Sequence, residues 1–146
     1  MDGRLENISI LRISKSLAGV LLLIIGGMIY IIFRPDNLVM FSWFDGIGLT
    51  PYIEYLRTEY GDISIYSWIR YNMPAALWLF SYLFIIDSIW GKEKSIIYSY
   101  FIYVLPILAL MSELMQAINL LPGTFDYMDF ASYLIAIIIF LILKKF

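Results

Sequence analysis

The chain has 146 residues, of which 62% are hydrophobic, 18% aromatic and only 15% charged. A soluble domain of this length carries about a quarter charged residues, so we expect an integral membrane protein built as one helical unit over residues 1–146, without a second domain. The net charge of −2 does not indicate a nucleic-acid partner, and the lack of Cys and His excludes disulfides, thiolate nucleophiles, imidazole bases and zinc sites of the usual kind.

The first predicted membrane span covers residues 16–33, an uncharged run that ends before Arg34. As an α-helix it would rise about 27 Å, close to the thickness of the hydrocarbon core. A signal peptide is the alternative, but the run is longer than a usual signal core and no small-residue cleavage site follows it, so we expect a retained helix. Gly19 and Gly26 share one face, which favours close packing of another helix there.

Residues 34–71 form the predicted loop between the first two spans. Thr50 and Pro51 are typical of an N-cap and the first helical position, and Gly61 of a helix end. The short helix between them places its aromatic side chains opposite a polar face formed by Glu54, Arg57 and Thr58. We expect this helix to lie in the plane of the membrane interface, or to cover a site as a lid.

Three further spans are predicted at about residues 72–90, 95–121 and 126–146, with a tight helical hairpin at 91–94 and a helix end at Pro122 and Gly123. The sequence thus predicts an all-α protein, a polytopic transmembrane four-helix bundle with a short interfacial helix in its first outward loop. Asp87 lies one turn from the end of the second span, where headgroup water would reach it, and we assign it no special role.

Basic residues set the expected orientation. Seven of the ten lie on one side of the four-span arrangement, namely Arg4, Arg12, Lys15, Lys92, Lys94, Lys144 and Lys145. The positive-inside rule then places both termini in the cytoplasm, and the loop 34–71 and the stretch 111–130 outside. We expect a multi-pass protein of the bacterial inner (cytoplasmic) membrane.

Polar side chains are predicted to meet at the outward ends of the last three spans. The six residues are Arg70, Asn72, Glu113, Gln116, Asp126 and Asp129. Glu113 and Gln116 are three positions apart and so share a helix face. A carboxylate beside hydrocarbon is costly unless it is paired or hydrated, so we predict one ligand-binding site from these six residues. The structural alternative is that Asp126 caps the last helix and that Glu113 bonds Arg70 or a Tyr hydroxyl to hold the helices together.

The segments E-L-M-Q at 113–116 and P-G-T-F-D-Y-M-D at 122–129 resemble the VanZ-like family of small polytopic bacterial membrane proteins. The family pattern has Glu-x-x-Gln on one helix, an Arg before an Asp-rich turn, and an Asn on the last helix. Four candidate residues match it by position, namely Glu113, Gln116, Asp126 and Asp129. The resemblance covers residues 70–143, and the chain departs from the family's motifs at Ala75, Gly123 and Tyr133.

The resemblance implies a cell-envelope protein whose outward polar pocket engages a lipid-linked glycan or glycolipid and affects glycopeptide susceptibility, with membrane lipids around it. Two other interpretations remain open. One is a non-catalytic accessory subunit that assembles with other membrane protein subunits. The other is a carboxylate- or metal-dependent enzyme acting on a lipid phosphate, because carboxylate oxygens suit Mg²⁺ and Ca²⁺. We assign no catalytic residue, metal ligand or cofactor, and favour a protein that is not an enzyme.

Overall fold

The structure, a computed structural model, describes residues 2–90 and 95–144. Within these residues the fold is all-helical, with 80% of the chain in helices and no strand. The hairpin predicted at 91–94 and the last two positions of the predicted fourth span lie outside the described residues.

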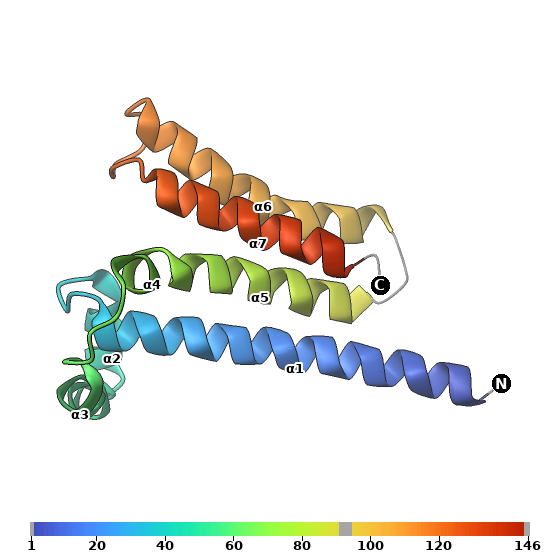
Figure 1. The fold of residues 1–146 in the computed structure, drawn as a ribbon, viewed down its shortest axis with the longest axis horizontal. Helices are drawn as coiled ribbons and strands as arrows, with labels where there is room; N and C mark the ends of the chain where they lie inside the picture. The colour runs from blue at the N-terminus through green and yellow to red at the C-terminus, as the bar shows by residue number, and fades with distance from the viewer. Residues whose placement is uncertain (1, 91–94, 145–146) are drawn as a thin grey trace.

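Four long helices run side by side, with α5 in the centre (Figure 1). They are α1 (Asp2–Phe33), α5 (Met73–Trp90), α6 (Ile96–Ala117) and α7 (Tyr127–Leu143). Helix α5 packs against α1 on one side and against α6 and α7 on the other. Both ends of the chain lie at one end of this arrangement, and three short helices lie toward the other: α2 (Val39–Gly46), α3 (Thr50–Tyr60) and α4 (Ser67–Tyr71).

Three of the described helices are long and apolar enough to cross a membrane: Ser9–Phe33 within α1, Met73–Trp90 and Ile96–Ala117. Helix α7 is also apolar but shorter, with 17 residues. These lengths and compositions are those of a membrane protein.

Helix α1 begins at Asp2, well before the predicted start at residue 16. The prediction relied on the uncharged run, yet the polar segment before it is helical too. Two of its basic side chains reach the end of α5, where Arg12 donates hydrogen bonds to the Ser88 and Ile89 carbonyls and Lys15 pairs with Asp87. The carbonyls in the last turn of a helix have no partner within it, so these contacts stabilise the end of α5 and the extension of α1 together.

The close approach of a second helix at Gly19 and Gly26 is confirmed. A Cβ atom added at Gly19 would lie 2.7 Å from Ile85 Cγ1, and one added at Gly26 would lie 2.8 Å from Trp78 Cδ1. Both neighbours belong to α5, so the two glycines form the groove into which α5 packs.

Helix α6 ends at Ala117, earlier than the predicted end at residue 121. The cause is Asn119, which adopts a left-handed conformation with φ of 58°. Its N–H donates to the Gln116 carbonyl, and the Leu120 N–H donates to the Met115 carbonyl. This is the Schellman arrangement, in which Asn takes the position more often held by Gly. The helix is therefore ended by Asn119 rather than by Pro122 and Gly123.

The buried core lies between α5, α6 and α7 and contains Leu79, Leu83, Tyr98, Ile102 and Phe140. The rings of Phe84 and Phe140 meet edge to face, with centroids 6.1 Å apart. This packing fixes the positions of the helix ends that carry the polar side chains.

The short helix α3 ends at Tyr60, as predicted, but its N-cap is Leu49 rather than Thr50. Its orientation also differs from the prediction in one respect. Ile53 is buried and Arg57, expected on the polar outer face, points inward and donates to the Ile31 and Arg34 carbonyls at the end of α1. A cation at a helix C-terminus is favoured by the helix dipole, so Arg57 anchors α3 to α1.

Candidate functional site

Asn72 lies at the centre of a group of acidic side chains. It occupies the break between α4 and α5, and it is only 5% exposed. Its side-chain amide donates to Asp126 Oδ2 at 3.1 Å and to Asp129 Oδ1 at 2.9 Å. One buried amide thus holds two carboxylates from the start of α7.

Glu113 joins the same group from α6. Its side chain is 6% exposed, and its Oε2 accepts a hydrogen bond from the backbone N–H of Asp126 at 3.2 Å. Asp126 also caps α7, since its Oδ1 accepts from the Met128 N–H at 2.8 Å. We refer to Asn72, Glu113, Asp126 and Asp129 as the carboxylate cluster. Its acids gather at the N-terminus of α7, where the helix dipole favours negative charge.

Gln116 lies against Gly123 in the loop before α7, and Tyr133 lies near the carboxylate cluster. Gly123, in the loop before α7, has a φ of 129°, and a Cβ atom added there would lie 2.9 Å from Gln116 Cδ. A side chain at such a φ is strained, and Gln116 fills the space that it would occupy. Tyr133 is within electrostatic range of Asp129 and Glu113.

Arg70 is a predicted site residue that does not join the carboxylate cluster. The ion pair with Glu113 that the structural alternative named does not form, because the Arg70 guanidinium lies against the rings of Phe33 and Tyr71, at 5.8 and 6.0 Å from their centroids. Among the described residues, the ion pair with a nitrogen–oxygen distance of 4.0 Å or less joins Lys15 to Asp87 and does not involve Arg70. Of the arginines, Arg34 lies within electrostatic range of Asp129. Arg34 was not predicted as a site residue, although this arginine directly follows the first span.

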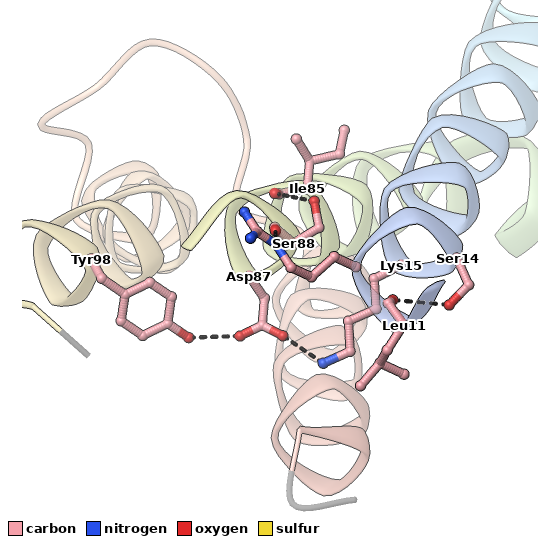
Figure 2. A network of polar contacts seen from close by, with 8 residues as sticks. Leu11, Ser14, Lys15, Ile85, Asp87, Ser88 and Tyr98 are labelled. Carbon is pink, nitrogen blue, oxygen red and sulfur yellow. Dashed lines mark hydrogen bonds and ion pairs between the residues drawn. The ribbon is translucent and has the colours of Figure 1, made fainter. Parts of the chain in front are cut away.

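A second polar group lies at the opposite end of α5, around Asp87 (Figure 2). The Asp87 carboxylate accepts from Lys15 Nζ at 2.7 Å and from the Tyr98 hydroxyl at 2.9 Å. Lys144 adds a cation over the Tyr98 ring, 4.7 Å from its centroid. We refer to Lys15, Asp87 and Tyr98 as the Asp87 cluster, which links α1, α5 and α6.

Asp87 was predicted to be hydrated and to have no special role, and the structure shows that this prediction is wrong. Asp87 is 5% exposed rather than hydrated. One feature of the sequence pointed to the pairing. Lys15 precedes the first apolar run and Asp87 stands near the end of the second, so antiparallel packing brings them to the same level.

A cavity of about 380 Å³ lies between α2, α3 and the loop that follows α1. Its lining carries three carboxylates, those of Asp36, Asp45 and Glu54, together with Arg57 and the ring of Phe41. Asp45 accepts a hydrogen bond from Thr50 Oγ1 at 3.1 Å. None of the lining residues belongs to the carboxylate cluster.

Within residues 2–90 and 95–144, no three acidic side chains are arranged to hold a metal ion. The carboxylate cluster can instead accept hydrogen bonds from donors such as hydroxyl groups, because ionised carboxylates are pure acceptors.

No protein-family model, curated protein or solved structure matches the chain.

Proposed function

We propose that this chain is a VanZ-like cell-envelope protein of the bacterial inner membrane. In this proposal its outward carboxylate cluster engages a lipid-linked glycan or glycolipid, and the protein thereby affects glycopeptide susceptibility. The observation that carries the proposal is the convergence of Asn72, Glu113, Asp126 and Asp129 from three separate segments of the chain.

Four membrane crossings fit the arrangement of the helices. Helix α7 has 17 residues, at the lower end of the range that can span. It packs against α5 and α6, so it occupies the same layer as the three longer apolar helices (Figure 1). It also returns the chain from the far end of α6 to the end where both termini lie. We therefore treat α1, α5, α6 and α7 as a transmembrane four-helix bundle.

The orientation follows from this crossing number and the basic residues. Arg12 and Lys15 contact the last turn of α5, and Lys144 directly follows α7. These helix ends lie at the end that holds both termini (Figure 1). The positive-inside rule places this end in the cytoplasm. The carboxylate cluster then faces outward, where lipid-linked envelope components are accessible.

The chemistry of the carboxylate cluster suits a glycan. Sugar hydroxyls are hydrogen-bond donors, and carboxylates accept such bonds more strongly than neutral acceptors do. A buried carboxylate without a full set of donors is costly, so a hydroxylated ligand would be stabilising at Glu113 and Asp129. The positional match of Glu113, Gln116, Asp126 and Asp129 to the VanZ-like pattern supports the same interpretation.

Glu113→Gln and Asp129→Asn test this proposal, because each keeps the shape and an acceptor oxygen but removes the charge. We expect the free energy of unfolding in detergent to change by less than about 1 kcal/mol. In the native host, each variant should alter glycopeptide susceptibility as deletion of the protein does. Glu59→Gln, an exposed acid on α3, is the control and should behave as the wild type. Wild-type susceptibility in both cluster variants would refute the proposal.

Purification in mild detergent separates this function from a role as an accessory subunit. We expect a bound glycolipid or lipid-linked glycan, identified by mass spectrometry, in the wild type and less of it in Glu113→Gln. A stoichiometric protein partner without such a lipid would indicate the accessory subunit instead.

A further inference from the structure

Two arginine side chains at the outward end lack the partners that other basic residues have. Arg12 and Arg57 donate to backbone carbonyls, and Lys15 pairs with Asp87. The guanidinium groups of Arg34 and Arg70 make no hydrogen bond or ion pair within the described residues, and the Nε atom of each is buried without a partner. A guanidinium carries five N–H donors, and leaving such donors buried and unpaired is costly.

The two guanidinium groups share an aromatic neighbour. Both lie over the same ring, that of Tyr71, with the Arg34 Cζ at 5.4 Å and the Arg70 Cζ at 6.0 Å from its centroid. Tyr30 supports Arg34 at 5.3 Å and Phe33 supports Arg70 at 5.8 Å. These rings do not supply the oxygen acceptors that guanidinium N–H groups prefer, so the two arginines keep the capacity to bind an anion.

The sequence positions of the two arginines place them at the depth of the lipid headgroups. Arg34 directly follows the apolar span Ser9–Phe33, and Arg70 stands three residues before the span Met73–Trp90. Both are at the outward end in the proposed orientation. Anions at this depth are predominantly phosphates of lipids, which arginine binds with bidentate hydrogen bonds.

We propose that Arg34 and Arg70 form an anion site that binds the phosphate of a membrane lipid or lipid-linked molecule, beside the carboxylate cluster. This inference rests on the membrane orientation of the proposed function and names a second chemical group of its ligand. A lipid phosphate at the arginines would present the attached glycan to Glu113 and Asp129. Because Asp129 is within electrostatic range of Arg34, its charge opposes an anion there.

Isothermal titration calorimetry of the full chain in a neutral maltoside detergent tests the site. The probes are dihexanoyl phosphatidic acid, dihexanoyl glycerol, which has the same acyl chains without phosphate, and inorganic phosphate. We expect the phosphatidic acid to bind and the uncharged lipid not to. Arg34→Gln and Arg70→Gln should each weaken binding about tenfold or more, since each removes a charge-assisted contact. Arg12→Gln, which removes an arginine at the opposite end of α5, is the control and should bind as the wild type does.

The other variants distinguish the source of the phosphate and the two proposals. If inorganic phosphate binds and the arginine substitutions weaken its binding equally, the phosphate group is sufficient. If phosphatidic acid binds and inorganic phosphate does not, the ligand is a lipid. Both results support the site. Asp129→Asn should bind phosphatidic acid more tightly, although the proposed function predicts that it loses the glycan. The experiment therefore tests the anion site independently of glycan binding.

The conservative variants Arg34→Lys and Arg70→Lys keep the charge and serve if a glutamine variant does not fold. They lose the planar fork of donors, so they should bind phosphatidic acid more weakly than the wild type but still more tightly than the uncharged lipid. Equal affinity of the wild type for the two lipids would overturn the proposal. So would wild-type affinity for phosphatidic acid in the variants at both Arg34 and Arg70.

Discussion

Asp87 has a partner on each side, a lysine from α1 and a tyrosine from α6 (Figure 2). Both partners are needed because a lone carboxylate at this depth has neither water nor counter-ion. Asn72 has the complementary role at the other end, where one amide serves two carboxylates. At each end, residues far apart in the sequence complete one another's hydrogen bonds.

The two members of the Lys15–Asp87 pair should respond differently to substitution. The Lys15 side chain is 24% exposed and that of Asp87 only 6%. After Asp87→Asn the lysine can extend its ammonium group to water, so the loss of stability should be modest. Lys15→Met leaves a buried carboxylate with the Tyr98 hydroxyl alone, and breaking a buried pair in this way costs about 3–5 kcal/mol.

Reversible unfolding in mixed detergent micelles measures both changes. Lys15→Arg retains the charge and is the control, for which we expect a smaller loss than for Lys15→Met. An Asp87→Asn variant as unstable as Lys15→Met, or more so, would contradict this account of the Asp87 cluster.

At the scale of elements, small residues and helix ends determine how the helices meet. The glycines of α1 admit α5, and Asn119 ends α6 with a left-handed turn. That turn directs the chain back toward α7, so that Asp126 can cap α7 and still donate its N–H to Glu113. The geometry of the carboxylate cluster thus depends on where α6 stops.

Adjacent glycines provide a test of the groove between α1 and α5. Gly26→Ala places a Cβ 2.8 Å from Trp78 Cδ1, whereas a Cβ at Gly27 meets nothing within 4 Å. We expect Gly26→Ala to destabilise the protein by about 1–3 kcal/mol through overpacking. Gly27→Ala should be neutral or stabilise by up to about 1 kcal/mol, because Ala favours the helix over Gly. Melting curves in the same detergent measure the stability change of each variant. Equal changes for the two substitutions would show that the groove is not the cause of the destabilisation.

At the scale of the whole molecule, polar groups are divided between two ends of an apolar layer. One end holds both termini and the Asp87 cluster, and the other holds α2, α3, α4 and the carboxylate cluster (Figure 1). This division predicts which parts of the chain a reagent outside the cell can reach.

Single cysteines report the orientation cleanly, since the chain has none of its own. Ser67 and Thr124 are exposed at the end proposed to face outward, and Ser14 is exposed near the other end. In intact cells a membrane-impermeant maleimide should label Cys at Ser67 or Thr124 and should label Cys at Ser14 only after permeabilisation. Labelling at Ser14 from outside would reverse the orientation and remove the basis for an outward site.

The sequence by itself determined the helical class, most helix positions and the glycine face of α1, because these depend on local composition and spacing. It also selected the acids of the carboxylate cluster, since charges beside long apolar runs are conspicuous. The tertiary structure decided the partners. Arg70 lies against aromatic rings instead of pairing with Glu113, and Asp87 pairs with Lys15, 72 residues away. Such choices depend on which helix ends reach the same level once α5 packs between its neighbours, and local spacing carries no information about that.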